Sequence, residues 1–210
     1  MPRRGDPVTV VLMKTIGIGG PPGCGKSTVA RALAHDKGTE WIDLDRVATG
    51  LYRPGNEVYY KLIARFGPGI VTADGEIDRS ALARLVFSDG RARADLDAIV
   101  HPAVSDALRR MIAERQKSGT KVLLVEGALI GLSPHVDYSL FDAVIWLSAP
   151  REVRRARLAE AGREDHLDRV PDFPTVPGVI TVDAAGTIAE TAEKVQALIA
   201  RLDERAAGAE

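Results

Sequence analysis

A single cysteine, Cys24, occurs among the 210 residues of this sequence. One thiol excludes an internal disulfide framework and a cysteine-rich metal site, and such sparse use of cysteine is typical of the reducing cytosol. Long apolar runs are also lacking, since none approaches the ~20 residues that a membrane-spanning helix needs. We therefore expect a cytoplasmic protein with no membrane partner.

An excess of either sign of charge is lacking as well, because 28 lysine and arginine residues balance 29 aspartate and glutamate residues to a net charge of −1. Proteins that hold nucleic acid electrostatically carry a basic excess, so we expect no nucleic-acid partner. The apolar content of 45% is ordinary for a globular chain. A chain of this length can bury one core with an insertion or two small cores, and nothing in it specifies an oligomeric state.

A glycine-rich motif at residues 20–27 fits G-x-x-x-x-G-K-[ST] at every fixed position. It follows an apolar run at residues 8–18, which predicts a buried strand, and precedes a helix-forming segment at residues 27–35. This order turns backbone N–H groups toward a polyphosphate, whereas the alternative is a chance glycine-rich turn. We expect Lys26 to reach the β- and γ-phosphates and Ser27 to bind Mg²⁺. The nucleotide-binding residues would be Gly20, Pro21, Pro22, Gly23, Cys24, Gly25, Lys26, Ser27 and Thr28.

The position of Cys24 permits two interpretations. It lies among backbone amides close to Lys26, and such a setting lowers the pKa of a thiol and makes it reactive. The alternative is a small residue chosen for its fit.

A second short strand, predicted at residues 39–43, brings Asp43 and Asp45 to its carboxyl end. Ligands of open α/β sheets bind outside these ends, so the two carboxylates could act as a general base and as a Mg²⁺ contact. The alternative is a helix cap for residues 46–51. We expect one carboxylate to cap and Asp45 to do chemistry.

Three further strands are expected at residues 121–125, 141–147 and 178–182. The first of them ends in Glu126 and Gly127, and this carboxylate resembles one that holds Mg²⁺ through water, although an ordinary exit from a strand is the alternative. The second precedes a helix with four arginines, of which one pointing at the phosphates would supply charge for phosphoryl transfer. The pattern predicts an α/β three-layer P-loop NTPase fold, with five parallel strands and helices on both faces.

Residues 55–118 interrupt this alternation with apolar residues at helical spacing, which predicts a helical insertion that binds a second substrate. Within it, His101 precedes Pro102 and is expected at the start of a long helix, because proline favours the first helical position. A histidine there is more often a structural hydrogen-bonder than a catalyst, so His101 is an acceptor-site candidate only.

Several motifs together resemble the dephospho-coenzyme A kinase family. They are IGIGG-PPGCGKST, WIDLDRVA, RPG, ARFGPGIV, ADGEIDRSALARLVFSD, LDAIVHPAV and LSAPREVRRARL. The resemblance implies an ATP-dependent kinase that phosphorylates the ribose 3′-hydroxyl of dephospho-coenzyme A, with Mg²⁺ and with ATP and dephospho-coenzyme A, or a relative of it, as small-molecule partners. It divides the chain into a nucleotide-binding core (residues 1–54 and 119–210), an acceptor-binding insertion (55–118) and a shortened lid (about 159–177).

The resemblance also implies roles for single residues. Asp45 would be the catalytic base and a metal contact, Lys26 and Ser27 would bind phosphate and Mg²⁺, and Arg157 would contact the transferring phosphate. Arg163, in the lid segment, would lie on the nucleotide side. The acceptor-binding residues would be Asp43, Arg53, Phe66, Arg79, His101, Glu126 and Gly127.

The chain departs from the family pattern at four ligand-facing places. They are Gly19 with Pro21 and Pro22, the Glu126-Gly127 pair, the lid with Pro171, Pro174 and Pro177, and Ala184. The three prolines disfavour a long lid helix, and the Glu-Gly pair is closer to that of nucleoside kinases. These departures leave two alternatives: a P-loop kinase acting on another nucleoside-like hydroxyl, or a non-catalytic nucleotide-binding regulator.

Overall fold

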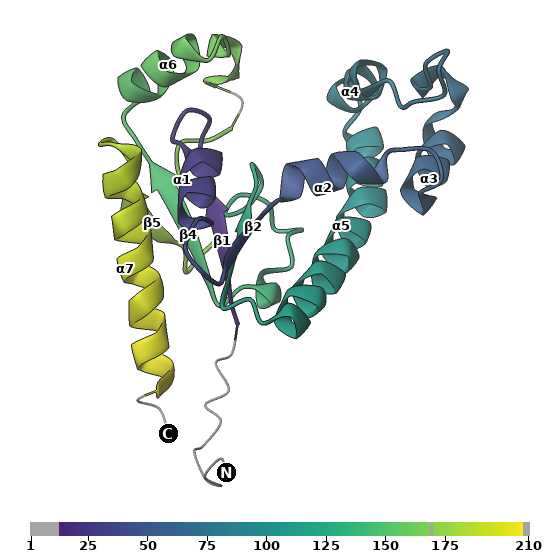
Figure 1. The fold of residues 1–210 in the computed structure, drawn as a ribbon. Coiled ribbons are helices and arrows are strands. Elements are labelled where there is room, and N and C mark those ends of the chain that lie inside the picture. Colours follow the sequence, from purple (N-terminus) through teal and green to yellow (C-terminus); the bar gives the residue numbers. More distant parts are fainter. Residues whose placement is uncertain (1–12, 169, 208–210) are drawn as a thin grey trace, which may run out of the picture.

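The computed structural model describes residues 13–168 and 170–207, and a parallel sheet of five strands lies at its centre (Figure 1). The strands follow one another in space as β2-β3-β1-β4-β5, and every neighbouring pair is parallel. The predicted P-loop NTPase sheet is therefore confirmed, although the part of the first predicted strand at residues 8–12 lies outside the described residues. The strands are β1 Lys14–Gly19, β2 Thr39–Asp43, β3 Val122–Glu126, β4 Ala143–Ser148 and β5 Ile180–Asp183.

Both faces of the sheet are covered by helices, as a parallel sheet requires. On one face, α1 (Lys26–Leu33) and α7 (Ile188–Ala207) pack against the side chains of Ile16 and Ile18. On the other, α5 (Gly90–Ser118) packs against Leu123 and Val125. Since side chains alternate along a strand, residues of the same strands serve both cores.

The segment between β2 and β3 is mostly helical. It holds α2 (Leu44–Leu51), α3 (Glu57–Phe66), a short 3₁₀ turn (Pro68–Ile70), α4 (Arg79–Ser88) and α5. Figure 1 shows α3 and α4 standing apart from the sheet, around the upper half of α5. They have a separate apolar cluster, in which Leu62, Leu82 and Val100 are buried.

Helix α5 belongs to two apolar clusters at once. Val100 packs with α3 and α4, whereas Leu108 packs with Ile42 and Leu123 of the sheet. The 29-residue helix is therefore one continuous element shared by the core and the insertion.

The expected start of this helix at Pro102 is wrong. Helix α5 begins at Gly90, where the side chain of Asp89 accepts a hydrogen bond from the Arg91 amide at 2.8 Å, and it continues through Pro102. The aspartate cap marks the start. Proline removes only the bond to the carbonyl of Ala98, and both residues lie on the exposed side of the helix, where water can replace that bond.

The remaining elements are short. Helix α6 (Arg151–Glu160) follows β4, and 3₁₀ turns occupy Tyr138–Leu140 and Glu164–His166. None of the helices in the described ranges combines the length and apolar character that crossing a membrane requires.

Candidate active site at the carboxyl ends of the central strands

The P-loop leaves β1 and enters α1 through a turn in which two glycines are required. Gly20 and Gly23 have φ angles of 144° and 84°, which favour glycine. A Cβ on Gly20 would lie 2.5 Å from the carbonyl oxygen of Leu147, and one on Gly23 would lie 2.6 Å from that of Arg154. The loop is thus closely packed against β4 and α6.

The N-terminus of α1 is suited to an anion. No side chain caps it, and its first turn contains no acidic residue, so backbone N–H groups are left for a phosphate. The ammonium group of Lys26 donates to the carbonyl oxygen of Gly20 at 2.7 Å, which holds it against the loop. The predicted P-loop conformation is present.

Carboxylates gather beside Lys26 because the ends of three strands are in register. Glu126, the last residue of β3, pairs with Asp43 of β2 and with Ile18 of β1. Glu126 is only 3% exposed. Burial raises the pKa of its carboxyl group, and the interaction with the Ser27 hydroxyl lowers this pKa by a smaller amount. Glu126 therefore faces the P-loop.

The two aspartates after β2 have different surroundings. Asp43 is the N-cap of α2, since its Oδ1 accepts a hydrogen bond from the Arg46 amide at 2.9 Å, which confirms that one of the pair is a cap. Asp45 lies in the first turn of α2, and its Oδ2 accepts from the Ala128 amide at 3.0 Å. Burial chiefly raises the pKa of Asp45, and the nearby charge of Asp43 adds to this. Of the two, Asp45 is free of the capping role.

The arginines of α6 do not form one solvated face. Arg154 is buried, with 1% exposure. Arg157 donates from Nη1 to the carbonyl oxygen of Ala184 at 2.9 Å and from Nη2 to that of Gly186 at 2.6 Å. It therefore ties α6 to the loop after β5 on the P-loop side.

The predicted lid contains no long helix within its described part. After α6 it has one 3₁₀ turn, Glu164–His166. Arg163 directly precedes this turn and is exposed, and its Nη2 lies 3.4 Å from Nδ1 of His166. This agrees with the helix-breaking effect of the three prolines.

The interpretation of Cys24 as a reactive thiol is wrong. Its side chain is 1% exposed, within the core cluster under the P-loop. Burial raises the pKa of this thiol, and the charge of Lys26 lowers it less. The Sγ lies only 2.7 Å from the place where a Cβ on Gly20 would be, so Cys24 is a small residue that fits.

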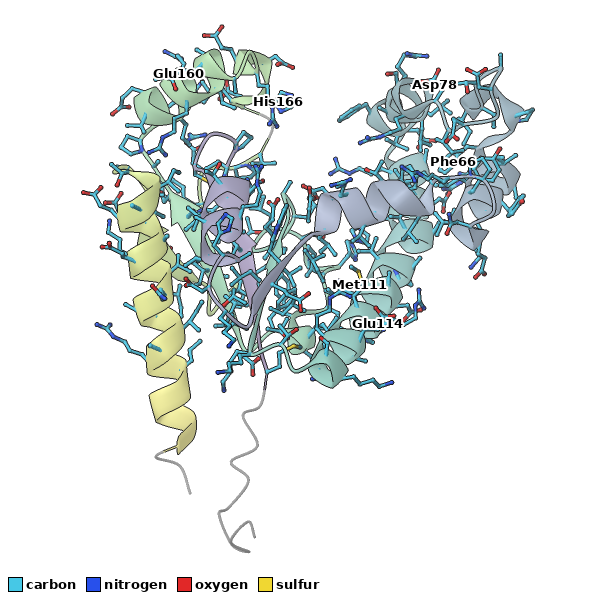
Figure 2. All side chains as sticks on the ribbon, in the orientation of Figure 1. Phe66, Asp78, Met111, Glu114, Glu160 and His166 are labelled. Carbon is cyan, nitrogen blue, oxygen red and sulfur yellow. The ribbon has the colours of Figure 1, made fainter. Side chains whose placement is uncertain are left out.

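The predicted acceptor residues are spread over the insertion. Arg79, at the start of α4, acts electrostatically on Asp45, whereas Phe66 packs against the insertion core and Arg53 is exposed after α2. In Figure 2, Phe66 and Asp78 lie on the insertion, opposite Glu160 and His166 beyond the P-loop, and Met111 and Glu114 lie at the far end of α5.

His101 lies on α5 away from the strand ends. Its Nε2 is 3.3 Å from Asp97, and its ring stacks on His135 with centroids 5.1 Å apart. Both histidines, with Arg93 and Arg109, line a cavity of about 600 Å³. The structure thus brings Lys26, Ser27, Asp43, Asp45 and Glu126 near one another. Arg79 on α4 exerts only a minor electrostatic influence on Asp45. Arg53 lies after α2, and His101 and Phe66 lie elsewhere on the insertion.

A glycine loop at an uncapped helix, with carboxylates beside its lysine and serine, defines a P-loop kinase. The family model for dephospho-CoA kinase matches residues 14–168. A dephospho-CoA kinase from Frankia casuarinae is 37% identical over 92% of this chain and 87% of its own length. One from Geobacter sulfurreducens is 33% identical over 90% and 98%. The chain belongs to the dephospho-CoA kinase family and is an ATP-dependent kinase.

Solved structures agree with this fold. A Thermus thermophilus protein, TT1252, superposes with a TM-score of 0.69 at 28% identity, over 91% of this chain and 98% of its own. A dephospho-CoA kinase from Campylobacter jejuni gives a TM-score of 0.60 at 16% identity, over 90% and 97%.

Proposed function

We propose that this enzyme transfers the γ-phosphate of ATP to the ribose 3′-hydroxyl of dephospho-coenzyme A, the last step of coenzyme A synthesis. The observation that carries the mechanism is the position of Asp45, which lies at the strand ends beside the P-loop and is not the helix cap. A carboxylate there can accept the proton of an attacking hydroxyl, and its raised pKa moves it toward the range in which a base is effective.

On the donor side, the backbone N–H groups of residues 23–28 and the ammonium of Lys26 would hold the triphosphate, whereas Pro21 and Pro22 have no N–H to donate. Lys26 has to exchange its bond to Gly20 for a phosphate oxygen. Arg157 would contribute charge to the transferring phosphate after exchanging bonds to the carbonyls of Ala184 and Gly186. Arg163 would approach from the lid segment.

The residues beside the P-loop fit Mg²⁺. Ser27 offers a hydroxyl and Asp45 a carboxylate, and Glu126, hydrogen-bonded to Ser27, offers a second carboxylate for a contact through water. Oxygen ligands of this kind are the ones that Mg²⁺ prefers. When bound with ATP, the ion neutralises charge that develops on the phosphates.

On the acceptor side, we assign residues 55–118 as the binding insertion. Arg79, the first residue of α4, is one proposed contact, and its positive charge has a minor influence on Asp45. The other proposed contacts are Asp43, Arg53, Phe66, His101, Glu126 and Gly127. The cavity beside His101 offers room for the part of the acceptor remote from the ribose.

The test is a coupled ADP-release assay with Mg-ATP, run with dephospho-coenzyme A, with adenosine and without an acceptor. We expect release only with dephospho-coenzyme A, and a 3′-phosphate in the product by ³¹P NMR. Faster ADP release with adenosine than with dephospho-coenzyme A would show that the acceptor is a different nucleoside-like molecule. If the protein binds ATP but releases no ADP with any acceptor, a regulatory role is supported instead.

A further inference from the structure

The buried arginine of α6, Arg154, is bonded in four directions. Its Nε donates to the carbonyl of Ala149 at 3.2 Å, and its Nη1 lies 3.5 Å from that of Pro22 and 3.4 Å from that of Leu167. Its Nη2 donates to Oδ1 of Asp172 at 2.5 Å. A guanidinium is retained in such a buried place only when its donors are satisfied. Arg154 thus joins the P-loop to the chain beyond α6.

Arg154 reaches residues 172–176, a segment that we call the crosspiece. Its first residue is held twice, because the indole Nε1 of Trp146 donates to the carbonyl of Asp172 at 3.1 Å. At its other end, the Thr175 amide donates to Gly131 at 2.9 Å, and the Thr175 hydroxyl donates to Leu132 at 2.6 Å. The crosspiece therefore runs from α6 to the loop after β3 (residues 127–137).

The loop after β3 leads directly to the proposed base. Its Ala128 amide donates to Asp45, and its Gly131 amide donates to the Tyr138 hydroxyl at 2.9 Å. Pro174, within the crosspiece, has a fixed φ angle and limits its flexibility. A continuous set of bonds thus connects Pro22 of the P-loop with Asp45.

We propose that Arg154 and Asp172 are positioning residues: through the crosspiece they set the spacing between the P-loop and the loop that holds Asp45. The inference rests on the proposed function, in which the triphosphate binds at the first and the acceptor hydroxyl at the second. Phosphoryl transfer depends on in-line alignment, and a displacement of about 1 Å can cost ~10²-fold in rate. In this enzyme the crosspiece, residues 172–176, acts as a fixed brace at the end of the lid segment.

Two variants test the brace. Asp172→Asn removes the charge that Arg154 meets but keeps an oxygen for its Nη2, and Thr175→Val removes the hydroxyl bond at the other end. Both side chains are exposed, but Asp172→Asn leaves the buried guanidinium without its counter-charge, so kcat is measured below the melting temperature of each variant. Asp168→Asn is the matched control, because Asp168 pairs with Arg151 outside this set of bonds. We expect each test variant to lower kcat by about ten- to a hundredfold. The double variant should lose no more than the worse single one, since both act through one element.

A structural role alone would lower the melting temperature and leave kcat near that of the control, and this result would overturn the proposal. So would losses that multiply in the double variant. Arg154→Lys keeps the charge without the planar fork, and if it folds, it should lose at least as much activity as Asp172→Asn.

A readout without acceptor separates this inference from the proposed function. Amide hydrogen exchange at Ala128 and Gly131 should become about tenfold faster in Asp172→Asn than in Asp168→Asn if the brace exists. Equal exchange would refute the brace whichever acceptor the wild-type enzyme uses. Faster exchange without any activity on dephospho-coenzyme A would refute only the proposed acceptor.

Discussion

Replacing Asp45 with asparagine tests the proposed mechanism most directly. The change keeps the size of the side chain and one oxygen for the Ala128 amide, but it removes the negative charge and the ability to take a proton. General-base catalysis contributes ~10²–10⁴-fold. We therefore expect kcat to fall by that factor, which at about 1.36 kcal/mol per tenfold corresponds to roughly 2.7–5.4 kcal/mol.

The stability of the fold should change much less than the rate. Among the described residues, the carboxylate of Asp45 accepts hydrogen bonds from the Ala128 amide alone, and one such bond contributes about 0.5–1.5 kcal/mol. Its charge in the first turn of α2 adds about 0.3–1 kcal/mol with the helix dipole. A chain of this size shifts its Tm by roughly 2–4 °C per kcal/mol, so the variant stays folded at assay temperature.

The assay is coupled ADP release with saturating ATP and dephospho-coenzyme A. Asp43→Asn is the matched control, because asparagine also caps helices well. The wild-type kcat should decrease as pH falls through the raised pKa of Asp45, because only the ionised carboxylate accepts a proton. The Asp45→Asn variant should lack this decrease. A variant that keeps more than a tenth of kcat, or a control that loses more than the variant, would refute the assignment.

Three further outcomes are expected. Lys26→Ala should lower kcat/KM by at least about 10²–10³-fold. Its thermal melt should be unchanged, because among the described residues the ammonium group donates hydrogen bonds only to P-loop carbonyls. Wild-type turnover would contradict this prediction. Glu126→Gln should raise Tm at neutral pH while lowering Mg²⁺-dependent transfer. Burial raises the pKa of Glu126, so above that pKa the ionised wild-type carboxylate destabilises the fold. The gain in Tm of the glutamine variant should therefore vanish as pH falls and the wild-type carboxyl group is protonated. An unchanged Tm at neutral pH would show that ionised Glu126 does not destabilise the fold. Alkylation of Cys24 should be slow with and without Mg-ATP, because the thiol is buried with a raised pKa; rapid labelling that ATP prevents would contradict this.

Local sequence signals predicted much of this structure. The strand at residues 39–43 has the predicted bounds. The cap at the start of α7 is equally local, because Thr187 and Glu190 bond each other's main chain. The Thr187 amide donates to Glu190 at 2.8 Å, and the Glu190 amide donates to the Thr187 hydroxyl at 3.2 Å. Such features depend on neighbours within a few residues, and the sequence contains those neighbours.

The features that could not be predicted depend on residues far apart in the chain. Cys24 is inert because β1, β4 and α7 enclose it, which its amide-rich local setting does not reveal. Arg154 and its exposed neighbour Arg155 are both arginines of α6. Arg154 is the buried one because the fold brings Pro22 and Asp172 against it, and these residues are far away in the sequence. The capping of α2 by Asp43 was an open choice until the orientation of the helix decided it.

The shared helix α5 restricts how this kinase can enclose its substrates. In a protein whose acceptor domain hangs on two flexible linkers, the domain can swing as a separate body about those linkers. Here 29 residues of uninterrupted helix bind the insertion to the sheet, so a rotation of the insertion has to bend α5 or drag it across the sheet. The weakest point of that helix is Pro102, which lacks one main-chain bond and lies between Val100 of one cluster and Leu108 of the other. If α5 bends, we therefore expect the bend at the proline.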